Sequence, residues 1–311
     1  MERRDFLRSA VAGALALSAS SRALRAQATS SIRNVTNRVS VINVGGNNVL
    51  CLKAVPSDRF VLVDCGPPNS RDQLQASLGS FVGSAKLEIL FNTHFHIDQT
   101  GNNELFAAAG AKIIAHEHTR QWMSTDYWLP DENRYERARP KTAHPTETFR
   151  TTGTLQVGTA NYPEVIDYGH LPLAHTDGDI YVFFKNSNVL AVGDVAAGLR
   201  DPALDWLTGA WIGGRVDAMD TILKLSNDDT QIVPASGPVM NRTEFKEERD
   251  MMEEVRSRIW KRTLQGDSAR EMLEAGVLDG LLRAWKDPYK FLYDAAKGMF
   301  AHHNKLDPAV I

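Results

Sequence analysis

The sequence predicts an α/β fold in which two β-sheets stack on each other and helices cover the outside. Short Val-rich runs fill the first part of the chain, a second set of such runs follows residue 160, and helical periodicity dominates after residue 215. A chain of 311 residues with 43% hydrophobic residues can bury a core of that size. We expect residues 29–311 to form one structural domain with a helical C-terminal segment.

The first half is expected to begin with a meander whose turns are rich in Gly, Asn and Pro. A helix, a buried strand, a second helix ended by Gly110 and a further strand follow it. The expected strands are Val39–Val44, Val49–Ala54, Phe60–Asp64, Leu87–Phe91 and Lys112–Ala115, and the expected helices are Ser70–Leu78 and Asn103–Ala109.

The second half repeats the β-rich pattern before it turns helical. Residues 120–150 show little periodicity, so we expect a long loop with a helix at its start. Capping-box pairs and an Asp-Pro step mark the starts of the last helices. The expected strands are Tyr162–Asp167, Ile180–Phe184, Val189–Val192 and Gln231–Val233, and the expected helix starts are Arg215, Asn241, Ser268 and Asp287.

Residues 1–28 resemble a twin-arginine export signal. Arg3 and Arg4 precede an apolar stretch from Ala10 to Ala19, and Ala26-Gln27-Ala28 fits a cleavage site. The alternatives are an amphipathic helix or a membrane anchor, but the apolar stretch is shorter than the roughly 20 residues that span a bilayer. We expect a periplasmic protein with no stable membrane anchor after cleavage.

The charge of the exported chain argues against nucleic acid as a partner. Removing residues 1–28 lowers Lys+Arg from 35 to 30 and Asp+Glu from 38 to 36, which leaves a net charge of −6. The sequence has no basic cluster interleaved with aromatic residues. A small-molecule substrate is therefore the expected partner. Cys51 and Cys65 are the two cysteines, and their places around the predicted hairpin favour two free, buried thiols.

The densest group of possible metal ligands directly follows the strand at residues 87–91. His94, His96 and Asp98 occupy alternate positions, and on an extended chain alternate side chains project to one side. Two imidazoles and a carboxylate would then converge on one point. That donor set suits Zn²⁺, which accepts nitrogen and oxygen ligands.

Two more candidate ligands lie at the ends of predicted strands. His175 comes shortly before the strand at Ile180, and Asp194 follows the strand Val189–Val192. Loops at strand ends are where a sheet scaffold usually carries functional side chains.

Together these motifs resemble the metallo-β-lactamase fold superfamily. The likeness rests on Thr-His-x-His-x-Asp at 93–98, Ala-His-Thr-x-Gly-Asp at 174–179 and the Gly-Asp that ends a strand at 193–194. It also includes the turn at 46–48, Asp64-Cys65-Gly66 and the Pro-Ala-Ser-Gly-Pro segment at 234–238, so that it runs from about Val39 to Glu248. The resemblance implies an αββα sandwich with a metal site at one edge.

The resemblance also implies a ligand set. His94, His96 and His175 would hold a first metal, with Asp194 bridging to a second that Asp98 would bind. Where the family usually has two further His ligands of the second metal, this chain has Gln99 and Ser236. Their neutral oxygens are poorer ligands for zinc than imidazole nitrogen. We therefore expect one well-formed zinc site, with the second weak or absent.

The leading hypothesis is a hydrolase that acts through a metal-activated water on a small ester, lactam, thioester or phosphoester, with Asp98 as the proton acceptor. One alternative is a chain that keeps the fold but has lost catalysis and binds a ligand or a protein partner, as Gln99 and Ser236 suggest. Another is mononuclear iron redox chemistry, because His and carboxylate ligands also suit iron.

The remaining candidates have less specific signals. His116 and His118 lie two residues apart, and such a pair alone is a weak signal for a metal site. His170 could line the cleft or support a ligand. Asp64 is expected to hydrogen-bond a ligand His. Aromatic residues in the irregular segments either line a substrate pocket or bury those segments against the body; they are Trp122, Tyr127, Trp128, Trp206 and Trp211.

Overall fold

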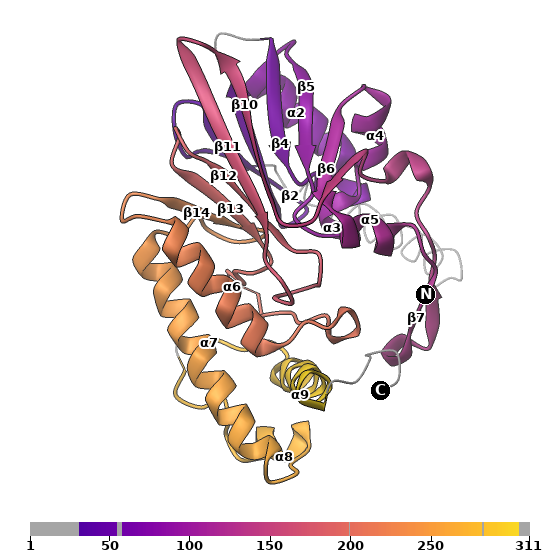
Figure 1. Cartoon of the computed structure of the whole chain (residues 1–311), viewed down its shortest axis with the longest axis vertical. Helices are drawn as coiled ribbons and strands as arrows, with labels where there is room; N and C mark the ends of the chain where they lie inside the picture. Colours follow the sequence, from indigo (N-terminus) through magenta and orange to yellow (C-terminus); the bar gives the residue numbers. More distant parts are fainter. Residues whose placement is uncertain (1–30, 55–57, 199, 282, 305–311) are drawn as a thin grey trace, which may run out of the picture.

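Two β-sheets stack face to face between two layers of helices in the computed structural model of the chain (Figure 1). The structure describes residues 31–54, 58–198, 200–281 and 283–304. This arrangement confirms the predicted sandwich. The predicted export signal lies outside the described residues.

The first sheet changes from antiparallel to parallel pairing at its centre. Its strand order is β1-β2-β3-β4-β5-β6-β9, and every pair from β4 to β9 is parallel. Parallel strands bring their carboxyl ends to one edge, so the loops after β4, β5 and β6 meet there. The strands are β1 Ser31–Asn34, β2 Val39–Val44, β3 Asn47–Ala54, β4 Arg59–Val63, β5 Lys86–Phe91, β6 Lys112–His116 and β9 Glu147–Phe149.

The second sheet has the order β10-β11-β12-β13-β14. Its first four strands pair antiparallel, whereas β14 pairs parallel with β13. The strands are β10 Thr152–Thr159, β11 Tyr162–His170, β12 Ile180–Phe184, β13 Val189–Gly193 and β14 Gln231–Pro234.

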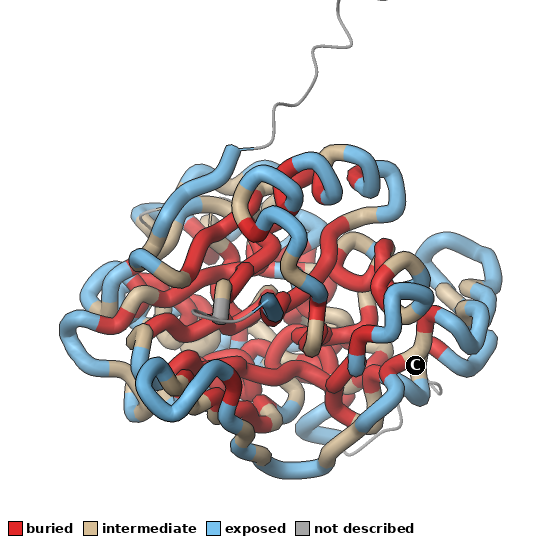
Figure 2. Tube along the Cα trace, turned by 90° about the horizontal axis from the view of Figure 1, so that it is seen from above, coloured by how far each residue is buried: buried red, intermediate tan, exposed pale blue. Residues whose placement is uncertain are grey.

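The alternation of apolar residues along the strands builds three buried layers. On β3, Leu50 and Leu52 pack between the sheets, while Val49 and Cys51 face the outer helices α2 (Arg71–Val82) and α4 (Asn103–Ala108). On β13, Val189 packs between the sheets and the next residue faces the helices on the other side. Figure 2 shows the buried strands running through the middle, with exposed turns around them.

Four helices complete the C-terminal side: α6 (Ile212–Leu225), α7 (Arg242–Thr263), α8 (Ala269–Glu274) and α9 (Pro288–Asn304). Asn241 with Glu244 and Ser268 with Glu271 form the predicted capping boxes at the starts of α7 and α8. Among the residues described, no helix is both long enough and apolar enough to cross a membrane.

The segment 120–150 is more structured than the sequence predicts. After α5 (Glu117–Met123), β7 (Tyr127–Leu129) and β8 (Arg134–Glu136) form a separate hairpin. Strand β10 is also absent from the prediction. Both are largely exposed, so neither carries the continuous apolar signal on which the prediction depended. Short 3₁₀ turns occur at Pro68–Ser70, Pro130–Glu132, Lys141–Ala143 and Trp206–Thr208.

Both cysteines are free and buried, as expected. Cys51 lies opposite Leu62 on β4, while Cys65 lies beyond the end of that strand. The Cys65 thiol donates to the Gln99 carbonyl at 3.3 Å, so it supports the loop that carries the His motif.

Candidate metal centre

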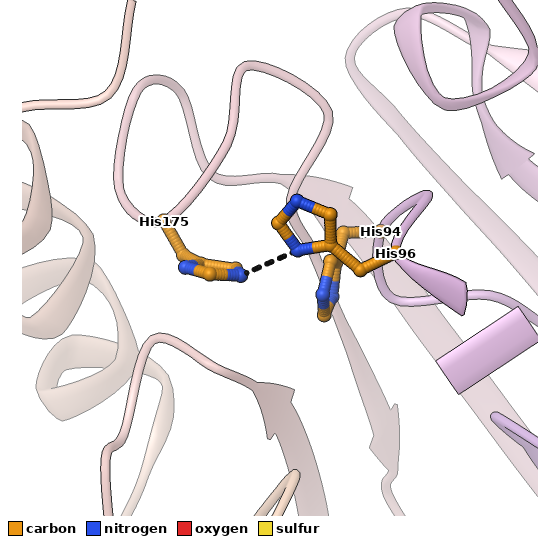
Figure 3. Close-up of side chains that lie close together, drawn as sticks. All are labelled: His94, His96 and His175. Atoms are coloured by element: carbon orange, nitrogen blue, oxygen red, sulfur yellow. Dashed lines mark hydrogen bonds between the residues drawn. The ribbon is translucent and has the colours of Figure 1, made fainter. Parts of the chain in front are cut away.

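Three loops at one edge of the sandwich bring the candidate ligands together. His94 and His96 lie between β5 and the short helix α3 (Ile97–Thr100), and His175 lies in the loop between β11 and β12. Asp194 directly follows β13. In Figure 3 the His175 ring approaches from the side opposite His94 and His96.

One donor atom from each of His94, His96 and His175 lies within 4.8 Å of the other two. His96 Nδ1 and His175 Nε2 are 3.0 Å apart, as the dashed line in Figure 3 marks. The extended backbone expected from His94 through Asp98 is wrong, because the chain turns into α3 at Ile97. His175, from the other sheet, takes the third position instead.

Hydrogen bonds fix the tautomer of His94. Thr93 donates its hydroxyl to Asp64 Oδ2 at 2.7 Å and its backbone N–H to Asp64 Oδ1 at 2.8 Å. When Asp64 is ionised, both of its oxygens accept, so the Thr93 hydroxyl proton goes to the carboxylate and the imidazole donates across the 3.2 Å contact between His94 Nδ1 and Thr93 Oγ1. The lone pair of His94 is therefore on Nε2, a buried atom for which the described residues offer no hydrogen-bond partner.

Hydrogen bonds also set the tautomers of His175 and His96. His175 Nδ1 lies 2.9 Å from the Ala203 carbonyl, which can only accept, so Nε2 carries the lone pair. His96 Nε2 lies 3.1 Å from Asp205 Oδ2 and donates to that carboxylate, which places the lone pair on Nδ1.

The three lone pairs thus converge, and those of His96 and His175 face each other at 3.0 Å. Two lone pairs at that distance repel unless a positive charge lies between them. A proton or a metal ion meets this need, and orienting a ligand imidazole through its second nitrogen is the usual support of a metal site. The residues present therefore fit a divalent ion bound by three imidazoles.

Asp194 adds a carboxylate beside the imidazoles. Its Oδ2 lies 3.6 Å from His94 Nε2 and 4.0 Å from His175 Nε2. Burial, followed by the nearby Asp98 charge, raises the pKa of Asp194 to about 6. A cation held by the imidazoles would stabilise the ionised form of Asp194 and so offset the effect of burial on its pKa.

The electrostatics of the imidazoles agree with a cation site. Burial lowers the pKa of His94 and of His175 well below the usual value; the imidazoles of His175 and His96 lower the pKa of His94 further, and His96 lowers that of His175. Burial also opposes charge on His96, but the carboxylates of Asp205, Asp98 and Asp194 together outweigh it and raise the pKa of His96. Neutral imidazole is the form that binds metal.

Asp179 and Arg215 hold the loops that present His175 and Asp194. Asp179 Oδ2 accepts the backbone N–H of His175 at 2.5 Å. The fully buried Arg215 donates to the Ala203 carbonyl at 2.7 Å and to the Asp194 carbonyl. Ala203 therefore connects Arg215 to the His175 ring.

Asp64 acts on the site by a different route from the one expected. It contacts Thr93 rather than a ligand ring, so it orients His94 through one intervening hydroxyl. Asp64 adopts φ +61°, which turns its carboxylate from the end of β4 toward the loop after β5. Burial raises the pKa of Asp64 to about 8 despite the two hydrogen bonds from Thr93.

The residues assigned to a second metal are arranged differently from the three imidazoles. Gln99 Nε2 donates to Asp98 Oδ2 at 3.3 Å, and the Arg200 guanidinium lies 3.5 Å from the same oxygen. Gln99 Oε1 and Ser236 Oγ are buried, and neither has a hydrogen-bond partner in the described part of the chain. Their role as weak ligands stays a prediction.

A pocket of about 370 Å³ opens beside the imidazoles. His96, Asp98 and Asp205 line it, and the contacting rings of Phe95, Trp122 and Tyr127 form an aromatic wall. The β7–β8 hairpin supplies the outer wall, including Arg134 and Arg137.

Of the five predicted aromatic residues, Trp122 and Tyr127 therefore line the pocket. Trp206 is buried against the body, and Trp211 stacks on the His302 ring at 3.7 Å, away from the imidazoles. Trp128 lies exposed on the hairpin and packs against Tyr135.

His116, His118 and His170 form a separate group. His116 stacks on His170 at 3.8 Å, and His118 Nδ1 lies 3.1 Å from Asp177 Oδ2. His170 Nε2 contacts the Asp177 carbonyl at 2.8 Å, so this group supports the loop of His175 rather than adding a ligand.

Several residues that complete the site were not among those predicted from the sequence. Asp205 and Ala203 lie in an irregular loop and carry no local motif, so only the fold reveals their contact with the ligand rings. Thr93 and Asp179 were visible as parts of the two His motifs, and their polar side chains beside ligands were a usable signal.

Comparisons with known proteins agree with this geometry. The family model described as the metallo-beta-lactamase superfamily matches residues 43–236. Nothing among the curated proteins matches the sequence. Among solved structures, the metallo-beta-lactamase from Pontibacter korlensis aligns with a TM-score of 0.57 and 16% identity over 72% of this chain and 99% of that one. The DIM-1 metallo-beta-lactamase aligns with a TM-score of 0.55 and 17% identity over 72% and 97%.

Proposed function

Because the chain belongs to the metallo-beta-lactamase superfamily, we propose that it is a metal-dependent hydrolase that works with one zinc ion held by His94, His96 and His175. The observation that carries the proposal is the convergence of three imidazole lone pairs, each fixed by a hydrogen bond on the other ring nitrogen. A bound zinc ion would act as a Lewis acid and lower the pKa of a coordinated water from about 15.7 to about 7.

The chain's own groups supply the remaining steps. Asp98 lines the pocket beside His96, and its carboxylate accepts a proton from the attacking water. Gln99 and Arg200 both donate toward Asp98 Oδ2, which holds the carboxylate in one orientation and leaves Oδ1 for the proton. General-base action of this kind typically contributes about 10²- to 10⁴-fold to the rate.

The pocket limits the substrate to a small molecule. About 370 Å³ suits a ligand of small-molecule size, and the wall of Phe95, Trp122 and Tyr127 favours an apolar or aromatic group next to the bond that is cleaved. Esters, lactams, thioesters and phosphoesters all present an oxygen that an electrophilic site can polarise.

Metal analysis of the purified protein, together with turnover of ester, lactam, thioester and phosphoester substrates, tests the proposal. About one zinc per chain with turnover that a chelator abolishes is the expected result. No metal and no turnover would favour the ligand-binding alternative, and about one iron with oxygen uptake would favour an oxidoreductase. An Asp98→Asn variant that kept both its zinc and full activity would refute the role of Asp98.

We also propose that the protein is exported to the periplasm. The support is the twin-arginine-like segment at residues 1–28, since that route carries folded proteins and allows a metal to be bound before export. The protein recovered from a periplasmic fraction should begin near residue 29. Protein that keeps residues 1–28 and stays in the cytoplasm would contradict export.

A further inference from the structure

Arg200 lies among the residues that would bind a second metal ion. Its Nη1 is 3.5 Å from Asp98 Oδ2, and its Nη2 donates to Asn47 Oδ1 at 2.8 Å and to the Gly46 carbonyl at 3.0 Å. Gly46 adopts φ +83°, a conformation that favours glycine and lets this turn present its carbonyl to the guanidinium. The turn between β2 and β3 thus holds Arg200 over Asp98.

Gln99 turns the N–H side of its amide toward Asn47 and Asp98. Its Nε2 donates to Asn47 Oδ1 at 3.0 Å and to Asp98 Oδ2 at 3.3 Å, so it presents N–H groups rather than a lone pair to the carboxylate. Asp98 and Asn47 are acceptors in this network, while Gln99 and Arg200 are donors. These side chains hydrogen-bond one another, while the buried Gln99 Oε1 has no partner among the described residues.

The charges around Asp98 also disfavour a second metal ion. A metal ion needs converging lone pairs and a negative surrounding, but Asp98 already has a cation partner. A guanidinium stays protonated at any physiological pH, and its N–H groups cannot coordinate a metal. A second divalent ion beside Asp98 would have to displace Arg200 or bear its repulsion.

We propose that Arg200 takes the place of the second metal ion: it neutralises and positions Asp98 and restricts the site to one ion. The inference rests on the proposed function only for the first ion. A second ion is then absent for two reasons: the Arg200 guanidinium lies beside Asp98, and Gln99 and Ser236 stand where two imidazole ligands would be needed.

The test is to restore the missing imidazoles with and without the arginine and to count bound zinc by native mass spectrometry and elemental analysis. The wild-type chain and Gln99→His/Ser236→His should each hold one ion. Adding Arg200→Ala to that pair should give two ions, with the second bound on the order of 100-fold more tightly than in the pair.

Two further variants separate the effect of the charge at position 200 from the effect of removing any arginine side chain. In the same double-His background, Arg200→Lys keeps the charge and should hold one ion. Arg256→Ala removes an arginine that pairs with Glu253 on α7, and it should also hold one ion. A triple variant that fails to keep the first ion is replaced by Gln99→His/Arg200→Ala, for which the same gain of a second ion is expected.

The inference is overturned if the double-His protein binds two ions while Arg200 is intact, or if removing Arg200 adds no second ion. These outcomes depend on the difference between variants. The proposed function depends instead on the first ion of the wild-type chain, so the two can fail separately.

Discussion

Replacing Asp205 by Asn tests whether the hydrogen bond behind a ligand ring tunes the metal site. Asp205 Oδ2 accepts from His96 Nε2 at 3.1 Å, and it is the one carboxylate that contacts a ligand ring from behind in the described structure. Asn keeps the shape but removes the charge, so His96 loses both basicity and the preference for a lone pair on Nδ1.

The expected loss of zinc affinity follows from the role of Asp205 as a hydrogen-bond partner behind a ligand imidazole. Loss of a hydrogen-bond partner behind a metal ligand typically weakens metal binding by about 10- to 100-fold, which corresponds to roughly 1.4 to 2.7 kcal/mol. The Asp205 side chain is 18% exposed, so little solvent screening reduces the effect. The zinc dissociation constant of Asp205→Asn should therefore rise by about that factor.

The assay is a competition titration of zinc between the protein and a chromophoric chelator. Asp201→Asn is the matched control, because Asp201 belongs to the same loop but accepts the backbone N–H groups of Lys286 and Asp287 instead of a ligand ring. An affinity for zinc within twofold of wild type in Asp205→Asn would show that the Asp205 carboxylate does not support metal binding, and an equal loss in both variants would assign the effect to the loop.

Three further changes test other parts of the account. Trp122→Ala removes part of the pocket wall and should raise KM for a substrate with an aromatic group by about tenfold, with kcat little changed. Trp128→Ala, on the exposed part of the hairpin, should alter neither KM nor kcat. Equal effects of the two variants would show that this pocket does not bind the substrate. Burial, followed by the charge of His170, lowers the pKa of His116 from 6.5 to about 4, so between these pH values the unfolded chain binds a proton that the native chain does not. Acidification over that range should therefore lower the free energy of unfolding by roughly 1 to 3 kcal/mol, a loss that His116→Gln should lack when urea denaturation is followed at several pH values. Asp179→Asn should weaken zinc binding by about tenfold, since it loosens the backbone of His175, and unchanged binding would exclude that support.

The strands and the ligand motifs could be predicted from sequence because their signals are local. Val49 to Leu52 alternate between two buried layers, and His94 and His96 directly follow a fully apolar strand end. The contact of His175 with these residues could be expected only by resemblance, because it joins two sheets.

The other half of the site depends on tertiary placement. Asp205 and Arg200 lie in irregular segments, and nothing near them in sequence indicates that one contacts His96 and the other Asp98. The backbone at Asp98 was predicted to be extended and is helical, since an extended chain and a helix starting at Ile97 fit the same residues. The β7–β8 hairpin was missed because three-residue exposed strands carry no buried periodicity.

The central claim is that three imidazole lone pairs converge to bind one ion. Diffraction from crystals of the zinc-loaded protein, measured on both sides of the zinc absorption edge, tests it most directly. We expect one anomalous peak within bonding distance, about 2.0–2.1 Å, of His94 Nε2, His96 Nδ1 and His175 Nε2. A peak that lacks any of these three nitrogens, or no peak in zinc-saturated crystals, would contradict it.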